Sequence, residues 1–155
     1  MRSRIRRMVV GDLPSIVEIA KLLPQWFTES GLDGIARDVQ THEGFVALDD
    51  GNLVGFAIYA ADKDRNEAEL TWIAVHPELH RRSIGRTLVK TVEADLTQRG
   101  FLSLEVSTVA PTVEYEPYAR TRDFYHAIGF RDVRVDVKWF PSGDDRLLLG
   151  KQLRP

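Results

Sequence analysis

The spacing of apolar residues divides this sequence into alternating extended and helical segments. Two-residue alternation or short apolar runs indicate strands over residues 4–9, 45–48, 53–60, 67–75, 101–106, 133–137 and 147–152. Helical spacing indicates helices over residues 14–23, 32–40, 84–99 and 118–128. Asp12 is placed to cap the first helix, and Pro24, Gly100 and Gly129 follow helix ends. The predicted order is therefore β-α-α-β-β-β-α-β-α-β-β.

The connections between these segments predict how the strands pair. Asp49–Asn52 is a strong hairpin turn, because Asp-Gly and Gly-Asn tolerate positive φ. The strands from residue 45 to residue 75 should therefore form an antiparallel meander. The helix over 84–99 lies between two strands, which should consequently be parallel with a right-handed crossover. Valines alternate with charged residues over 133–137, which predicts a half-buried strand. We expect a mixed α/β (α+β) fold, with one sheet and helices on both faces.

Composition narrows the class of protein. A chain of 155 residues fits one domain, and 43% hydrophobic with 28% charged residues is ordinary for a soluble globular protein. The net charge of -2 argues against nucleic acid as the main partner. There are no cysteines, and no apolar run approaches the roughly 18 residues that span a bilayer. The basic N-terminus is not followed by an apolar signal core, so we expect a cytoplasmic protein without a membrane partner.

The stretch that follows the strand ending at Val75 resembles an anion-binding site. A basic turn leads into a helix that begins near Gly85. The first N–H groups of a helix have no partner within it and lie at its positive end, so an anion fits there and a small residue lets it approach. Positive charge around this point comes from Arg81, Arg82 and Arg86. The alternative is an ordinary connection with solvated arginines.

This same stretch resembles the acetyl-CoA motif of the GNAT N-acetyltransferase superfamily. That motif usually reads Val-x-Pro, a few residues, and then Gln/Arg-x-x-Gly-x-Gly/Ala. The six corresponding residues here are 80–85. Gly85 matches the final glycine, whereas His80 replaces Gln or Arg and Ser83 replaces the first glycine.

Two further features carry the resemblance across the chain. Tyr125 with Gly129 and Phe130 resembles the family's helix-to-strand signature, Tyr-x-x-x-Gly-Phe. Glu69 lies on the strand that leads to Val75, where many family members keep a catalytic glutamate. The order of elements also agrees with this fold, so the resemblance implies one GNAT domain over residues 1–155.

The resemblance implies an enzyme that transfers the acetyl group of acetyl-CoA to a primary amine of a small molecule or a protein. Backbone N–H groups of 81–86 would hold the pyrophosphate at the helix start. The strand edge at Ile73 and Val75 would pair with the pantetheine arm, because the strands over 67–75 and 101–106 part in this fold. The implied cofactor-binding residues are Ile73, Ala74, Val75, His80, Arg81, Arg82, Ser83, Ile84, Gly85, Arg86 and Thr87.

Amide formation from an amine needs two proton movements. An alkyl ammonium with a pKa of roughly 10.4 must lose a proton before it attacks, and the departing thiolate must gain one. The resemblance implies Glu69 as the general base, acting through a water, and Tyr125 as the general acid. The alternatives are a surface charge at a strand start for Glu69 and a core side chain for Tyr125.

The acceptor groove would be built from the N-terminal helices and the late loops, around Trp26, Phe27, Tyr115 and Trp139-Phe140. Trp26 and Phe27 are candidate acceptor contacts, or otherwise core or lid residues. Tyr118 stands where many family members have an asparagine. Tyr115 and Tyr118, with Arg120 and Arg122, could line a pocket for an anionic acceptor or could be solvated helix residues.

The histidines suggest little further chemistry. His80 could contact phosphate or simply occupy the turn. His42, His76 and His126 show no metal-ligand spacing, so no metal is assigned. A homodimer is a family tendency. Two alternatives remain open at this stage: an acyl-CoA-binding or sensor domain without catalysis, and a vicinal-oxygen-chelate module, which shares a Phe-Tyr-x-x-x-Gly-Phe signature.

Overall fold

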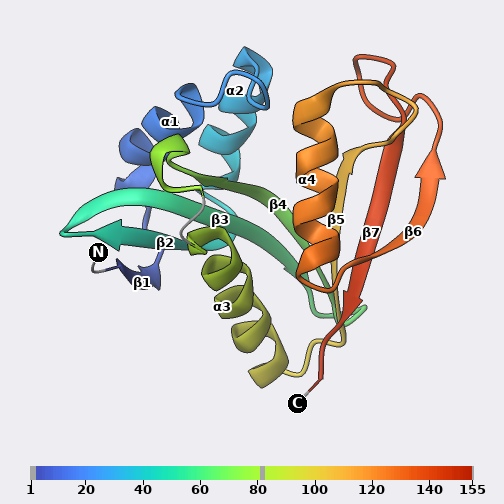
Figure 1. Ribbon diagram of the computed structural model, residues 1–155. Coiled ribbons are helices and arrows are strands. Elements are labelled where there is room, and N and C mark those ends of the chain that lie inside the picture. The colour runs from blue at the N-terminus through green and yellow to red at the C-terminus, as the bar shows by residue number, and fades with distance from the viewer. Residues whose placement is uncertain (1–2, 81–82, 155) are drawn as a thin grey trace.

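The computed structural model describes residues 3–80 and 83–154, and within these ranges it contains a seven-stranded sheet and four α-helices (Figure 1). The strands are β1 (Ser3–Arg7), β2 (Glu43–Asp49), β3 (Asn52–Asp62), β4 (Glu67–Val75), β5 (Ser103–Val109), β6 (Arg131–Asp136) and β7 (Arg146–Gln152). The helices are α1 (Leu13–Lys21), α2 (Glu29–Asp38), α3 (Ile84–Gln98) and α4 (Glu116–Ala127), with 3-10 helices η1 (Val10–Asp12) and η2 (Pro77–Leu79). The predicted order of strands and helices is confirmed.

Helix starts differ from the prediction where side chains make local hydrogen bonds. α2 begins at Glu29, earlier than predicted, because the Thr28 hydroxyl accepts a hydrogen bond from the Gly31 N–H at 3.3 Å. Asp12 precedes α1 but does not cap it. Its carboxylate instead accepts hydrogen bonds from the Arg6 guanidinium at 2.8 Å and the Val9 N–H at 2.8 Å. This pair joins the end of β1 to η1.

The seven strands form one continuous sheet in the order β1-β2-β3-β4-β5-β7-β6. Neighbouring strands are antiparallel, except that β4 and β5 are parallel as predicted. At the predicted hairpin turn between β2 and β3, Asp50 and Gly51 take positive φ values of 49° and 84°. A single sheet with a crossover does not contain the paired modules of a vicinal-oxygen-chelate fold, so that alternative is wrong.

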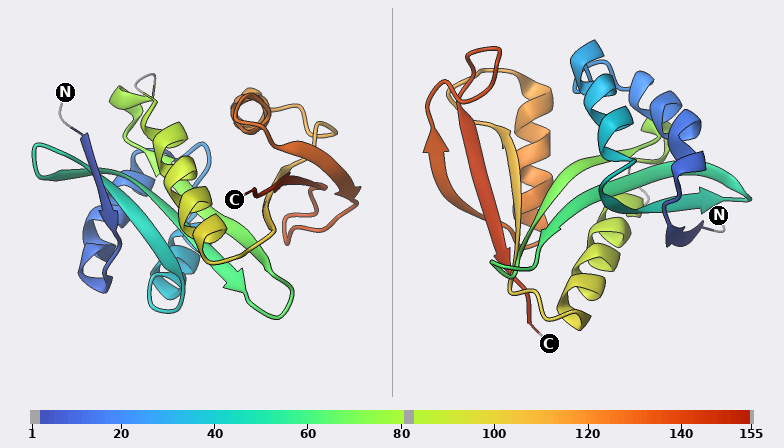
Figure 2. Two further views of the ribbon diagram at one scale, coloured as in Figure 1. Left: turned by 90° about the horizontal axis from the view of Figure 1, so that it is seen from below. Right: turned by 180° about the vertical axis from the view of Figure 1, so that it is seen from behind.

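The helices cover the two faces of the sheet differently (Figure 2). α1 and α2 pack on one face of β2–β4, over a cluster that includes Val46, Phe56 and Ile58. α3 packs on the opposite face of the same strands, and α4 lies beside β5 on that face. Residues from α3, α4, β5 and β7 share this second cluster, which includes Leu88 and Leu149. The two halves of the sheet therefore share one core on the α3 and α4 side only.

The prediction that the strand at 133–137 is half-buried was wrong. β6 is the outermost strand, and each of its residues from Arg131 to Val135 is exposed. Val133 and Val135 retain 55% and 47% of their surface, and Val137, just beyond the strand, retains 72%. Alternation of apolar and charged residues correctly predicted an extended segment. It could not reveal that this segment lies at the rim of the sheet, with its valines exposed.

A partly buried polar network joins α3 to the first and third strands of the sheet. The hydroxyl of Tyr59, a fully buried side chain on β3, donates to the Asp95 carboxylate at 2.7 Å. Arg7 of β1 and Arg99, just after α3, also donate to that carboxylate. Partial desolvation alone would raise the pKa of Asp95, but these hydrogen bonds hold it below its ordinary value.

Candidate functional site

The parallel strands β4 and β5 part halfway along their length. Their ladder runs from Glu67 opposite Ser103 to Leu70 opposite Val106, and beyond it β4 pairs, among the described residues, with β3 alone. The His76 N–H donates to the Val54 carbonyl on β3 at 2.7 Å, so the Val75 carbonyl on the other side of that peptide points into the gap. The expected free strand edge is therefore present at the end of β4.

An irregularity in β4 coincides with the point of parting. The register between β3 and β4 shifts so that Ile58 lies opposite Trp72 while Tyr59 lies opposite Leu70. Thr71 is the extra residue, and its hydroxyl donates to the Ile58 carbonyl at 2.9 Å. A bulge of this kind bends a strand and interrupts pairing. Thr71 could not be predicted from the sequence, because a bulge is defined relative to the partner strand.

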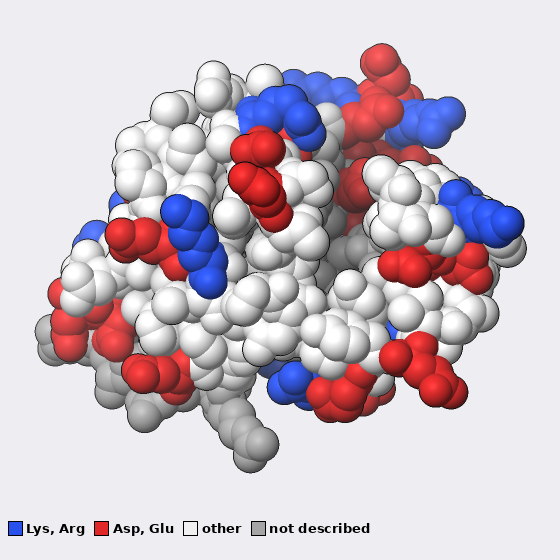
Figure 3. Space-filling model, turned by 90° about the horizontal axis from the view of Figure 1, so that it is seen from above, with Lys and Arg blue, Asp and Glu red and all other residues white. Residues whose placement is uncertain are grey.

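A cleft of roughly 730 Å³ lies over the gap between the parted strands. The surface is visibly hollowed between the α1–α2 side and the α4 side (Figure 3). Residues from the α1–α2 connection, the end of β4, the start of α3 and α4 line it: Leu23, Trp26, Phe27, Ile73, Ala74, Val75, His80, Ser83, Gly85, Arg86, Arg120, Thr121, Phe124, Tyr125, Ala127 and Ile128. Most of the predicted cofactor-binding residues thus meet in one cleft.

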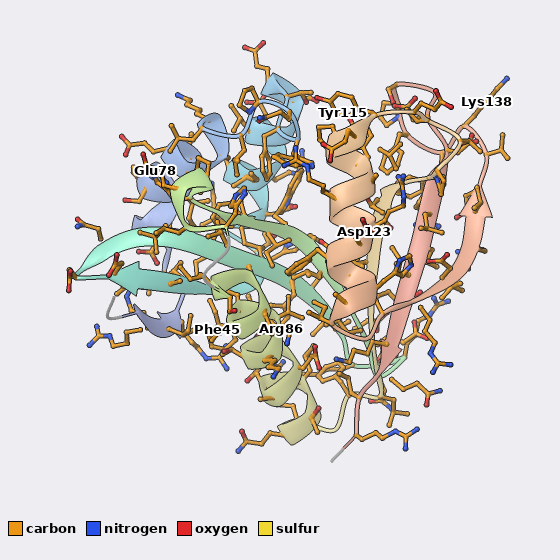
Figure 4. The ribbon with its side chains drawn as sticks, in the orientation of Figure 1. Phe45, Glu78, Arg86, Tyr115, Asp123 and Lys138 are labelled. Carbon is orange, nitrogen blue, oxygen red and sulfur yellow. The ribbon has the colours of Figure 1, made fainter. Side chains whose placement is uncertain are left out.

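The turn before α3 contains a residue in an unusual conformation. Ser83, which stands where the family motif has its first glycine, has a left-handed φ of 61°. Glycine adopts this conformation without strain, whereas serine does so at a cost. Arg81 and Arg82 lie outside the described residues. Arg86 lies on α3 and borders the cleft together with residues of α4 (Figure 4).

His80 contacts the free strand edge. Its Nε2 lies 2.7 Å from the Val75 carbonyl oxygen, so the ring donates to the group that points into the gap. The Trp26 ring approaches His80 edge-on at 6.4 Å, and the Trp26 N–H donates to the Thr121 hydroxyl on α4 at 2.9 Å. This chain of contacts crosses the cleft from β4 to α4.

Gly85 permits close packing between α3 and its neighbours. A Cβ atom at this position would lie 3.3 Å from the Phe124 ring atoms Cε1 and Cζ and 3.7 Å from Val75 Cγ2. The start of α3 therefore packs tightly against α4 at this point. Ile84 is buried in the core, so it could contact a ligand chiefly through its backbone N–H group. The Thr87 hydroxyl and N–H both donate to the Ser83 carbonyl, at 2.9 and 3.0 Å, so Thr87 closes the first turn of α3.

Tyr125 of α4 is a buried residue that lines the cleft. Its side chain is only 4% exposed and packs between Phe124 and Phe130. None of the described residues forms a hydrogen bond with the Tyr125 hydroxyl, and Tyr125 is among the residues that line the cleft. Burial raises the pKa of Tyr125 well above its ordinary value, so the hydroxyl is protonated at neutral pH.

Glu69 lies on the other face of the sheet from Tyr125. Its neighbours Ala68 and Leu70 belong to the core under α3 and α4, whereas Glu69 is exposed and is not part of the described cleft lining. Desolvation raises the pKa of Glu69, the Arg146 charge opposes this, and the Glu105 charge adds to it. Glu69 lies next to the point where β4 and β5 part, one residue before their ladder ends at Leu70.

Glu105 is a second carboxylate beside the gap, and it was not predicted from the sequence. It lies directly opposite Glu69 in the parallel ladder. Neighbouring strands are about 4.8 Å apart, so the two carboxylates lie close together beside the point where the strands part. Glu105 alternates with the buried Leu104 and Val106. This alternation, together with the predicted parallel crossover, could have indicated that Glu105 lies on the same face of the sheet as Glu69.

The remaining acceptor candidates divide into two groups. Trp26 and Phe27 line the cleft. Tyr115 and Tyr118 pack on each other, with ring centroids 4.7 Å apart, at the head of α4 outside the described lining (Figure 4). The Arg122 guanidinium donates to the Val109 carbonyl at 2.8 Å and so supports the loop after β5.

Within residues 3–80 and 83–154, no three His, Asp or Glu side chains are grouped so that they could hold a metal ion. In the same part of the chain, no helix is both long and apolar enough to cross a membrane.

Known proteins with similar sequences are acetyltransferases. The model of the acetyltransferase (GNAT) family matches residues 13–130. The uncharacterized N-acetyltransferase MJ1530 of Methanocaldococcus jannaschii is 27% identical over 111 residues, covering 70% of this chain and 65% of that protein. The [ribosomal protein bS18]-alanine N-acetyltransferase of Escherichia coli K12 is 28% identical over 102 residues, covering 66% and 64%. The chain thus spans just under two thirds of these relatives.

Solved structures share the fold along the whole chain. A GNAT-family protein from Desulfovibrio desulfuricans superposes with a TM-score of 0.88 at 24% identity, covering 99% of this chain and 100% of that one. The PaiA N-acetyltransferase of Thermoplasma acidophilum, solved with coenzyme A, gives 0.73 at 20% identity, covering 98% and 99%. The family model and the parted strands agree, and the chain therefore belongs to the acetyltransferase (GNAT) family.

Proposed function

We propose that this chain is an acetyl-CoA-dependent N-acetyltransferase that acts on a primary amine of a small molecule or a protein. The observation that carries the proposal is the parting of β4 and β5 beneath a cleft that contains Tyr125. The parting leaves backbone groups of Ile73 and Val75 without a strand partner on one side, as an extended amide-bearing arm requires.

The residues present fit acetyl-CoA at two points. The first N–H groups of α3, with Arg86 beside them, suit a pyrophosphate. The free edge of β4 suits the pantetheine amides, provided that His80 releases or shares the Val75 carbonyl. Acetyl-CoA supplies an activated acetyl thioester, which the attacking amine converts to an amide as the carbon–sulfur bond breaks.

The chain's own residues move the protons. The Glu69 and Glu105 pair, directly before the point of parting, takes the ammonium proton through a water. The raised pKa of Glu69 makes this carboxylate a better proton acceptor than an ordinary glutamate. Tyr125 gives its proton to the departing thiolate, and its lack of a described hydrogen-bond partner leaves the hydroxyl available for this step.

Binding of acyl-CoA without turnover is the second candidate function. Two observations favour it. His80 already forms a hydrogen bond with the Val75 carbonyl, and Glu69 lies outside the described cleft lining. Such a domain would bind acetyl-CoA but would not release the thiol in the presence of any amine.

The test is release of CoA thiol from acetyl-CoA across a panel of amines. The panel should contain polyamines, aminoglycosides, free amino acids, a lysine peptide and a peptide with an N-terminal alanine, since one relative acts on the alanine of a ribosomal protein. We expect amine-dependent release that Tyr125→Phe greatly reduces. Binding by calorimetry without release on any amine would support the second function, and no binding at all would refute both.

A further inference from the structure

The His80 side chain occupies part of the β4 edge that borders the gap. Its Nε2 lies 2.7 Å from the Val75 carbonyl oxygen, and the ring donates because a carbonyl can only accept. Alternate residues of a strand direct their backbone groups to the same side, so Val75 and Ile73 both face the gap. A carbonyl that an extended arm along β4 would use is therefore already hydrogen-bonded to a side chain of this protein.

The backbone of the turn after β4 is held in place, whereas the His80 ring is exposed. The Leu79 N–H donates to the His76 carbonyl at 2.8 Å, and the Leu79 side chain packs against the core under α3. His80 follows η2 directly and is exposed. Its ring can therefore leave Val75 by rotation about side-chain bonds, and the turn itself does not need to unfold.

The same ring belongs to a set of contacts that crosses the cleft. His80, Trp26 and Thr121 all line the cleft. The Trp26 ring lies edge-on to the His80 ring with centroids 6.4 Å apart, and its N–H donates to the Thr121 hydroxyl of α4 at 2.9 Å. The Arg120 guanidinium lies 5.5 Å from the centre of the Trp26 ring. An arm that runs along β4 past Val75 must displace the first member of this set.

We propose that the hydrogen bond from His80 to Val75 is autoinhibitory, and that it must break before acetyl-CoA can occupy the cleft. This inference rests on the proposed function in one respect, that the pantetheine arm pairs with the edge of β4. Only molecules whose His80 ring has turned away can then bind the arm, so the apparent affinity falls with the fraction of open molecules. A hydrogen bond of ordinary net strength keeps that fraction at roughly a tenth to a third.

Calorimetry with acetyl-CoA and with its nucleotide half tests the proposal. We expect His80→Ala to bind acetyl-CoA roughly fivefold more tightly than the unmodified chain, because no ring has to be displaced. The nucleotide half, 3′-phospho-ADP, carries the pyrophosphate but no arm, so its affinity should not change. His126→Ala is the matched control, because His126 is exposed and lies outside the described cleft lining, and it should bind both ligands as the unmodified chain does.

NMR of the unmodified chain with labelled histidine observes the hydrogen bond directly and does not depend on any variant for its result. We expect the His80 ring to carry a proton on Nε2, and His80→Ala identifies its signal by the loss of that signal. The hydrogen-bonded N–H should disappear as acetyl-CoA is added and should persist with 3′-phospho-ADP.

The possible results distinguish this inference from the proposed function. Equal or weaker binding of acetyl-CoA by His80→Ala would overturn the autoinhibitory contact while the proposed acetyltransferase stands. A parallel change in the affinity for 3′-phospho-ADP, or an Nε2–H signal that acetyl-CoA leaves in place, would overturn it in the same way. Failure of the unmodified chain and of both variants to bind acetyl-CoA would refute the contact and the proposed function together.

Discussion

Replacement of Gly85 by alanine tests whether the start of α3 is fixed by packing or by the ligand. The added Cβ would lie 3.3 Å from two ring atoms of Phe124. That ring packs against Tyr125 with centroids 5.4 Å apart, so it cannot move away freely. Overpacking costs about 1–3 kcal/mol. Alanine recovers up to about 1 kcal/mol as a better helix former than glycine.

The expected net effect of Gly85→Ala is a loss of about 1 kcal/mol in the free energy of unfolding. For a chain of this size, this lowers the melting temperature by about 2–4 °C. The measurements are thermal unfolding of the free protein and calorimetric titration with acetyl-CoA. Phe124→Leu is the companion variant, because a shorter side chain makes room for the new methyl group.

The double variant separates the two roles of Gly85. If tight packing is the whole reason for the glycine, Gly85→Ala with Phe124→Leu should recover both the stability and the affinity that alanine removed. If the backbone must also approach a phosphate group closely, stability should recover while affinity for acetyl-CoA stays low. Wild-type stability and wild-type affinity in Gly85→Ala alone would refute the reasoning on both counts.

Three further changes probe the proton transfers and the core. Tyr125→Phe should lower kcat by about a hundredfold with little change in the affinity for acetyl-CoA, and equal turnover would remove Tyr125 from the chemistry. Glu69→Gln or Glu105→Gln should move the alkaline rise of the pH–rate profile upward, toward the amine pKa of roughly 10.4; unchanged profiles in both variants would make the pair bystanders. Asp95→Asn should reduce stability in urea most above about pH 4, because the lowered pKa of Asp95 stabilises the fold there and this contribution is lost as pH falls through it; a pH-independent difference would contradict this.

Local signals in the sequence were sufficient for the elements around the cleft. β4 has the predicted bounds, because a polar turn precedes it and Pro77 stops it. α3 begins at Ile84 as predicted and ends one residue short of the prediction, ahead of Gly100, which takes a positive φ of 87°. Where turn residues and helical spacing determine the ends of an element, the sequence is sufficient to predict its bounds.

Features that depend on neighbours across the sheet were not predictable in the same way. The bulge at Thr71 exists only relative to β3, and the carboxylate pair of Glu69 and Glu105 exists only once β4 and β5 are in register. Alternation at 133–137 indicates two different faces of a strand but does not say whether either face is covered. The hydrogen bond from His80 to Val75 likewise depends on which way a turn folds back.

The shortness of the β4–β5 ladder has a consequence for folding. Its few paired residues must hold together strands separated in sequence by the whole of α3, and closing such a loop costs chain entropy before the pairing compensates. The β2–β4 meander needs only tight turns between its strands. We therefore expect the meander to form first and the half containing β5–β7 to dock late. The cleft, which lies along that joint, would then be the last part of the molecule to assemble.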